Sequence, residues 1–288
     1  MKLHDNKAIM FHGISNQFLY AVSRVELKFV NPTTSEEVES QGTGFFVVKD
    51  EQIYFITNRH VLDISRIDAK YVDFRLDTIK FDLRRYDKES KSTLSDKVEA
   101  VLYTKTLPDD DCDDVVCLSQ IKLEGKGVRA DVYFPYDMLA DEACLENEIS
   151  VCDSIAVIGF PYAYDRLNNM PVLRSGVISS DTRQNYSISN NYMGHVIAYE
   201  AYSTGGLSGS PVLALQKGFP VGGTLTTPEG FYRPVKIVGI NAGRLNDLDG
   251  VHQQMSYMYK SEVIRKLILK SEQGKGITIV SNKIVHPI

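Results

Sequence analysis

Short runs of β-branched and aromatic residues, separated by turn-forming residues, recur along most of the chain. Runs of this kind are typical of β-strands, and so many of them favour a sheet sandwich or a barrel. The expected strands cover residues 18–30, 42–48, 53–61, 98–106, 114–121, 155–160, 172–180, 195–202, 210–215, 235–245 and 254–260. Four polar residues, 49–52, join the second expected strand to the third, and a connection of this length predicts an antiparallel hairpin.

Two regions depart from the strand pattern. The spacing of apolar residues over 261–270 predicts a helix, with Ser261 as its N-cap and Lys270 in its last turn. Between residues 122 and 150 the pattern gives way to an acidic, mixed stretch, which we interpret as a crossover between two sheet units. The sequence therefore predicts an all-β chain with a β-barrel over 1–125, a crossover over 126–150, a second β-barrel over 151–260, and a C-terminal helix and tail over 261–288.

Charge and composition narrow the classes of partner. The formal net charge is −5, both signs are scattered and no block of Lys or Arg occurs, which argues against nucleic acid or a membrane as a partner. No apolar run approaches the roughly 20 residues of a membrane span, and the N-terminus lacks the apolar segment of an export signal. We therefore expect a cytoplasmic protein.

The four cysteines are too sparse for a disulfide framework, so we expect free thiols. Their spacing also lacks the close pairs of a zinc site. We expect neither a metal nor another cofactor.

Residues 203–212 are rich in glycine and serine around Ser208, and they come directly before an apolar run. Glycines beside a serine allow backbone N–H groups to turn toward the oxygen of an acyl group that the hydroxyl attacks. Gly206 and Ser208 would supply these N–H donors. Taken alone, the segment fits a plain glycine-rich turn equally well.

A histidine and an aspartate extend the serine pattern. His60 lies in the segment Thr57-Asn58-Arg59-His60-Val61, where an apolar strand ends and a short connection begins. Asp114 comes directly before an apolar strand, so its carboxylate could orient an imidazole. Asp113 is the competing candidate for this carboxylate.

Together, these segments resemble the trypsin-like (chymotrypsin-fold) serine peptidases, especially the bacterial branch that includes the HtrA-type proteases. The three motifs follow the family's order of histidine, aspartate and serine, and the serine motif is Gly206-Leu207-Ser208-Gly209-Ser210-Pro211. The resemblance implies two six-stranded antiparallel β-barrels with the site between them. It also implies a stand-alone peptidase unit, because only a short tail follows the expected C-terminal helix.

The resemblance implies a serine endopeptidase that hydrolyses peptide bonds of protein or peptide substrates through an acyl-enzyme. His60 would take the proton of Ser208 and later donate it to the leaving amine, while Asp114 would hold the imidazole. Tyr202 would lie near the base of the specificity pocket, with Asn241, Ala242 and Gly243 along one wall. Since no carboxylate occupies the position of Tyr202, we expect little preference for Arg or Lys and tolerance of small or medium apolar residues.

Other readings of the same residues are weaker, and one stays open. An α/β-hydrolase would need a glycine where Ser210 stands, and a calcium loop would need a glycine where Asp114 stands. The open alternative is a trypsin-fold binding or regulatory module that is inactive, or that becomes active only when a protein partner docks. Leu207 makes it relevant, because the digestive peptidases carry there an acid that stabilises the oxyanion loop.

Overall fold

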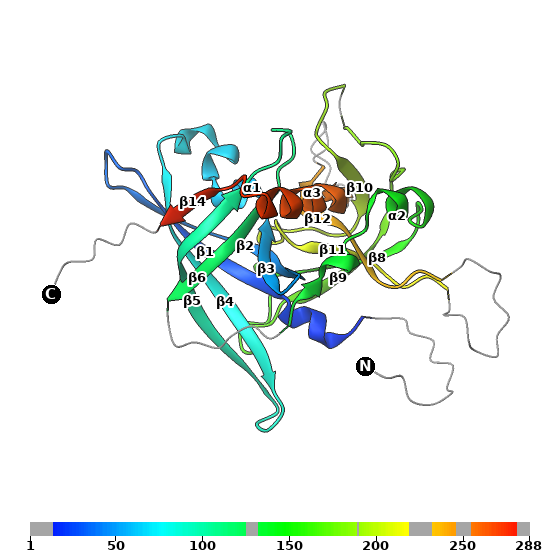
Figure 1. Cartoon of the computed structure of the whole chain (residues 1–288), viewed down its shortest axis with the longest axis horizontal. Coiled ribbons are helices and arrows are strands. Elements are labelled where there is room, and N and C mark those ends of the chain that lie inside the picture. The colour runs from blue at the N-terminus through cyan, green and yellow to red at the C-terminus, as the bar shows by residue number, and fades with distance from the viewer. Residues whose placement is uncertain (1–13, 125–131, 189, 219–231, 246–254, 281–288) are drawn as a thin grey trace.

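A computed structural model describes residues 14–124, 132–188, 190–218, 232–245 and 255–280. Two barrels lie side by side, and helix α3 (Ser261–Glu272) lies across both (Figure 1). None of the described helices is long and apolar enough to cross a membrane.

The first barrel closes six antiparallel strands. They are β1 (Val22–Val30), β2 (Glu37–Lys49), β3 (Gln52–Thr57), β4 (Arg75–Asp87), β5 (Ser92–Thr106) and β6 (Val116–Glu124). The order around the barrel is β1-β4-β5-β6-β3-β2, and β2 pairs with β1 again to complete the ring. Two short strands extend this sheet: β7 (Phe134–Pro135) runs parallel to β2, and β14 (Ile277–Val280) pairs with β5.

The second barrel is also closed by six antiparallel strands, in the order β10-β13-β12-β11-β8-β9. They are β8 (Ser154–Gly159), β9 (Val172–Ile178), β10 (Val196–Glu200), β11 (Pro211–Ala214), β12 (Lys236–Arg244) and β13 (Met255–Lys260). The prediction of an all-β fold with two six-stranded antiparallel barrels and a C-terminal helix is therefore confirmed.

The connections contain short helical segments. They are α1 (Arg59–Leu62), α2 (Glu142–Asn147) and the 3-10 turns η1 (Asn16–Tyr20), η2 (Ile64–Arg66), η3 (Ala69–Tyr71) and η4 (Tyr136–Met138). The crossover between the barrels contains β7, η4 and α2.

Three clusters of buried apolar side chains stabilise the barrels and hold them in a fixed position relative to each other. One fills the first barrel and a second fills the other. The third combines side chains of both barrels with the buried face of α3, including Phe45, Phe160 and Ile264. Burial of so much apolar surface between the barrels stabilises their contact, which is where the predicted site lies.

Several local expectations were wrong in detail. The sequence pattern missed β4 because charged residues alternate with its buried side chains, as in Ile79, Phe81 and Leu83. Residues 59–62 form α1 rather than the end of a strand. Ser261 is the first residue of α3 and not its N-cap, since its hydroxyl donates to the carbonyl of Ala140.

The hairpin between β2 and β3 is tighter than expected. Lys49 pairs with Gln52, so the loop has two residues, Asp50 and Glu51. Both have positive φ, 48° and 65°, as a type I′ turn requires. This turn matches the twist of the two strands that carry residues toward the site.

Candidate active site

His60 and Asp114 lie against each other at the edge of the first barrel. The amide of His60 donates to Asp114 Oδ1 over 2.9 Å, and His60 Nδ1 contacts Asp114 Oδ2. Because a carboxylate accepts, this contact keeps a proton on Nδ1 and leaves Nε2 free to act as a base. The backbone carbonyl of Asp114 accepts from the side chain of Asn58, which fixes the two segments together.

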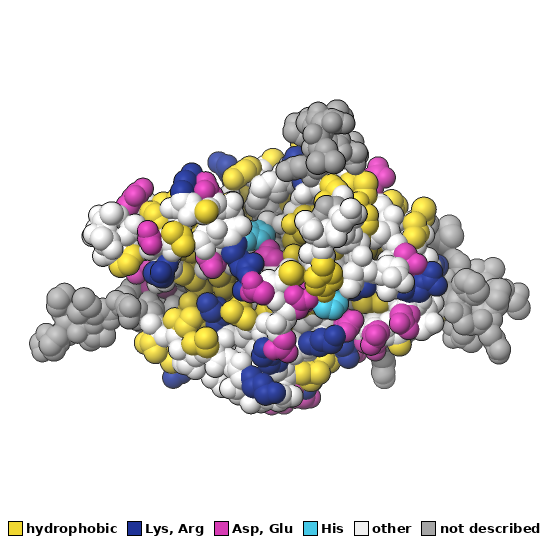
Figure 2. Space-filling model, turned by 90° about the horizontal axis from the view of Figure 1, so that it is seen from above, with side chains coloured by type: hydrophobic (Ala, Val, Ile, Leu, Met, Phe, Trp, Pro, Cys, Tyr) yellow, Lys and Arg dark blue, Asp and Glu magenta, His cyan; other side chains and the backbone are white. Residues whose placement is uncertain are grey.

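The neighbouring aspartate has a different partner. Asp113 accepts from the backbone N–H of His195 over 2.8 Å and lies 2.9 Å from His195 Nδ1. This pair joins the first barrel to the second. Figure 2 shows histidine side chains, in cyan, near the middle of the face seen from above. Of the two aspartates that the sequence offered for His60, the structure brings Asp114 to it.

The acidic loop around Asp113 also contains the one described group of metal-type ligands. Ligand atoms of Asp110, Asp113 and His195 lie within 4.8 Å of one another. Asp110 accepts from the hydroxyl of Tyr192 and the backbone N–H of Cys112. The carboxylates of Asp110 and Asp113 therefore both have hydrogen-bond partners within the protein.

Two consecutive turns, 204–207 and 207–210, form the segment that carries Ser208. The N–H of Leu207 donates to the carbonyl of Thr204, and the N–H of Ser210 donates to the carbonyl of Leu207. The third residue of each turn is a glycine with positive φ, Gly206 at 93° and Gly209 at 88°. These are features of type II turns, which explains why glycine stands at both positions.

The carbonyl groups of this serine loop, residues 204–210, are held by both barrels. Thr43 of β2 donates from its hydroxyl to the carbonyl of Gly206 over 2.6 Å, and its N–H donates to the carbonyl of Ser208 over 2.9 Å. The side-chain amide of Asn241 donates to the carbonyl of Leu207 over 2.6 Å. Leu207 itself is buried, so apolar packing replaces the acid that the digestive peptidases have at this position.

The N–H groups of Gly206 and Ser208 remain uncommitted. Neither donates to any group among the described residues. Two backbone donors beside a serine hydroxyl are the arrangement that stabilises the oxyanion of an acyl-transfer intermediate. The loop therefore has the features of a formed oxyanion hole.

The hydroxyl of Ser208 bonds to β12 of its own barrel. It donates to the carbonyl of Ala242 over 3.4 Å, and no hydrogen bond joins it to His60 among the described contacts. The structure thus brings His60 to Asp114, and it brings Ser208 to the same interface through Thr43. The segment before His60 takes part in this contact, because Thr57 donates from its hydroxyl to the carbonyl of Thr43.

The residues predicted to contact substrate have different environments. Tyr202 is 53% exposed, and Gly243 is partly exposed. Ala242 contributes the carbonyl that accepts from Ser208. The prediction for Asn241 needs correction, because this residue is fully buried and its side chain bonds to Leu207 and to the hydroxyl of Tyr199. Asn241 supports the serine loop instead of lining a wall.

Two tyrosines show that the surroundings of Asp114 are poorly hydrated. Burial raises the pKa of Tyr259 well above its ordinary value, and the charge of Asp114 adds to this effect. Burial, with a smaller contribution from Asp114, also raises the pKa of Tyr257. A carboxylate in such surroundings interacts strongly with an adjacent imidazolium.

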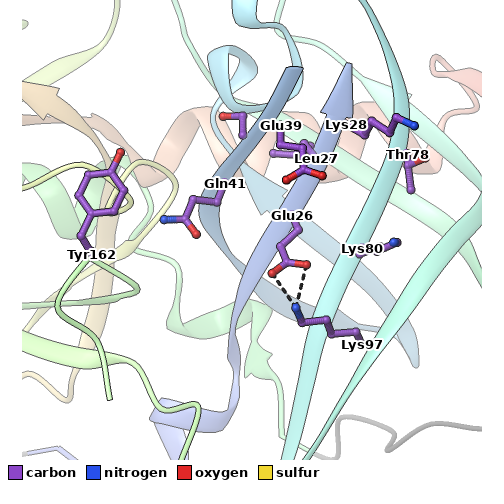
Figure 3. A pocket seen from close by; sticks show the side chains of 10 residues that line it. Glu26, Leu27, Lys28, Glu39, Gln41, Thr78, Lys80, Lys97 and Tyr162 are labelled. Atoms are coloured by element: carbon purple, nitrogen blue, oxygen red, sulfur yellow. Dashed lines mark hydrogen bonds and ion pairs between the residues drawn. The ribbon is translucent and has the colours of Figure 1, made fainter. Parts of the chain in front are cut away.

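A pocket of about 640 Å³ lies over the outer face of β1, β2, β4 and β5 (Figure 3). Charged side chains make up half of its lining, including the ion pair of Glu26 with Lys97. Gln41 and Tyr162 lie on its side nearest the serine loop, since Gln41 precedes Thr43 by two residues and the ring of Tyr162 packs on Gly205. The pocket is therefore adjacent to the candidate site.

Sequence reasoning missed three functional-site contacts: the hydroxyl of Thr43, the amide of Asn241 and the pairing of His195 with Asp113. The only local signal for Thr43 is its position between Gly42 and Gly44, where small neighbours permit a close approach. The contacts of Thr43 and of His195 with Asp113 join the two barrels, whereas the contact of Asn241 lies within the second barrel.

Two antiparallel barrels, with a histidine–aspartate pair on one and a glycine-flanked serine on the other, define the class of trypsin-like peptidases. The family model described as the trypsin-like peptidase domain matches residues 42–222, which is more than half of the chain. The chain belongs to this family, and its membership supports a protease function.

A solved structure of the HtrA-type protease AlgW with a decapeptide has the same fold. The similarity has a TM-score of 0.50 at 16% sequence identity and covers 88% of this chain. The chain spans 65% of the length of that structure. A comparison with curated proteins gives no match.

Proposed function

We propose that this chain is a serine endopeptidase that cleaves protein or peptide substrates with Ser208, His60 and Asp114. The observation that carries the proposal is the pair of N–H groups on Gly206 and Ser208 that have no acceptor among the described residues, together with a histidine already oriented by a carboxylate. Such N–H groups accelerate a reaction when a negatively charged oxygen forms next to them in the transition state.

In the proposed mechanism, Ser208 Oγ attacks the substrate carbonyl while Nε2 of His60 takes its proton. The N–H groups of Gly206 and Ser208 stabilise the oxyanion, and Asp114 stabilises the imidazolium. His60 then protonates the leaving amine, which departs and leaves an acyl group on Ser208. Water, deprotonated by His60, hydrolyses this acyl-enzyme and restores the serine.

The two halves of the substrate would lie on different barrels. The leaving amine must reach His60, so the part of the peptide after the cleaved bond lies along the first barrel. The backbone N–H and C=O groups of Gln41, like those of Thr43, point away from β1. Strand β3 pairs with β2 only from Phe45 onward, so it does not cover these groups of Gln41. The acyl half remains with Ser208 on the second barrel, next to Ala242 and Gly243.

A second candidate is a trypsin-fold module that is inactive until a protein partner docks. The hydrogen bond from the Ser208 hydroxyl to the carbonyl of Ala242 favours it, because the described contacts include none between this hydroxyl and His60. A single side-chain rotation is fast compared with enzymatic turnover, so we favour the constitutive enzyme. An activating partner and a cytoplasmic location stay predictions of the sequence.

Labelling with a fluorophosphonate, which phosphonylates only an activated serine, tests the proposal. We expect labelling of the wild type and no labelling of Ser208→Ala or His60→Ala. Ser210→Ala is the matched control, because Ser210 lies in the same loop and its buried hydroxyl has no partner among the described residues. A wild type that stays unlabelled, while a reference peptidase is labelled in the same tube, would overturn the constitutive enzyme.

A further inference from the structure

Two arginines hold the exposed ring of Tyr202 between them. The guanidinium carbon of Arg244 lies 5.1 Å from the ring centroid, and that of Arg174 lies 5.5 Å from it. Arg244 is the last residue of β12, and Arg174 lies in β9. Contact with an aromatic face fixes a guanidinium group in place while leaving its N–H edges available.

These arginines lie on the acyl side of the candidate site. Arg244 follows Ala242 by two residues of extended strand, a distance of about 7 Å, and the carbonyl of Ala242 accepts from Ser208. Arg244 also donates from Nε to the carbonyl of Ser203, which anchors it to the segment that leads into the serine loop. A peptide paired with the end of β12 would pass both guanidinium groups.

No described carboxylate neutralises either charge. Neither arginine forms an ion pair within the described part of the chain, and Arg174 Nε is buried without a hydrogen-bond partner there. Glu200 is close to Tyr202 in sequence, but it is exposed and pairs with neither arginine. Two adjacent cations with unused donors attract an anion, and a carboxylate matches the fork of N–H groups on each guanidinium.

We propose that Arg174 and Arg244 bind an acidic side chain of the substrate, on the residue that contributes the attacked carbonyl or on one of the two residues before it. The inference rests on the proposed peptidase function for the direction of the peptide. It refines the expectation of a small or medium apolar residue at the specificity pocket, because Tyr202 supports the charged groups instead of forming an apolar base.

The test uses blocked peptides, acetylated and amidated, so that the only carboxylate is the one under study. Peptides carrying Glu at one of the three positions are compared with peptides carrying Gln there. We expect kcat/KM of the wild type to favour Glu at least tenfold at one position, and 0.5 M salt to reduce the preference. Arg174→Gln and Arg244→Gln should each reduce it, and the double variant should remove it.

Further variants distinguish a loss of recognition of the acidic side chain from a loss of folding. Arg244→Lys keeps the charge and should retain part of the preference, whereas Arg183→Gln, which removes an exposed arginine paired with Asp181, should leave it unchanged. Thermal unfolding of each variant checks that it folds. A wild type that cleaves Glu and Gln peptides equally at all three positions overturns the inference while the peptidase stands.

Binding to Ser208→Ala distinguishes the two proposals. Fluorescence anisotropy of the labelled Glu and Gln peptides needs no cleavage, so it reports on the arginines even when the wild type is inactive. Tighter binding of the Glu peptide that is lost in Arg174→Gln and Arg244→Gln supports the site. Equal binding of both peptides overturns it.

Discussion

Thr43 of the first barrel donates its hydroxyl hydrogen to the carbonyl of Gly206 in the second barrel, over 2.6 Å. The same hydroxyl accepts from the N–H of Phe160 over 3.0 Å. Because Thr43 holds the carbonyl of Gly206, a side chain of one barrel restricts the conformation of the serine loop of the other.

Replacing Thr43 by valine should reduce turnover more than binding. Valine has nearly the same shape but lacks the hydroxyl, so the carbonyl of Gly206 loses its partner. We expect kcat to fall about 10- to 100-fold, somewhat less than the loss of an oxyanion donor itself, with KM changed less than about threefold. Steady-state kinetics on a peptide substrate measures both constants.

Thr43→Ser is the control for this prediction, because it keeps the hydroxyl and should retain most of the turnover. Thr43→Val also leaves the N–H of Phe160 buried without an acceptor, so its free energy of unfolding should drop by about 1–3 kcal/mol. Equal turnover in the valine and wild-type proteins would show that the loop does not depend on Thr43.

Gly206 and Gly205 form a matched pair for testing the serine loop. A Cβ on Gly206 would lie 2.3 Å from the carbonyl oxygen of Phe160, at a φ of 93° that side chains rarely adopt. A Cβ on Gly205 would meet the ring of Tyr162, which is 65% exposed and can move. We expect Gly206→Ala to lower kcat about 10²- to 10³-fold and Gly205→Ala less than tenfold. Similar losses in both variants would contradict the proposed donor role of Gly206.

The adjacent aspartates should differ sharply in their effect on activity. Asp114→Asn retains the shape but cannot hold the proton on Nδ1 of His60, so kcat should fall about 10⁴-fold. Asp113→Asn changes the contact with His195 and should lower kcat less than tenfold. Active-site titration with a chromogenic ester checks both variants, and a larger loss in Asp113→Asn would reverse the assignment.

The four free thiols should react at different rates with iodoacetamide. Burial raises the pKa of Cys144 to about 12 and that of Cys117 further, so at pH 8 both contain very little thiolate. Partial desolvation and the charge of Asp110 raise the pKa of Cys112 as well. Peptide mapping should therefore find Cys152 alkylated first, then Cys112, with every rate increasing with pH. Early modification of Cys117 would contradict the packing of the cluster between the barrels.

The residues of the predicted triad could be found in the sequence because each belongs to a short local pattern. His60 follows an apolar strand, Asp114 precedes one, and glycines flank Ser208. Chain order then relates these patterns to one another. The pattern of the adjoining strand favours Asp114 but leaves Asp113 as a competitor, because adjacent side chains on an extended segment point to opposite sides. Only the packed barrels bring Asp114 to His60 and Asp113 to His195.

Other features depend on contacts that no local pattern contains. Thr43 and Asn241 are ordinary residues of their strands, and their side chains gain a role only where the barrels meet the serine loop. The stacking of Arg174 and Arg244 on Tyr202 likewise joins three distant segments. Strand β4 was missed for a different reason, since charged residues, including the buried Asp82 and Arg84, alternate with its apolar residues.

Strand β14 pairs with β5, although the whole second barrel separates them in the chain. During synthesis on the ribosome, β1 to β6 emerge first and can pair among themselves. The strand that covers β5 becomes available only after residues 154–260 have been made. Residues 102–105 of β5, which pair with β14 and not with β4, therefore lack this partner while the second barrel is translated.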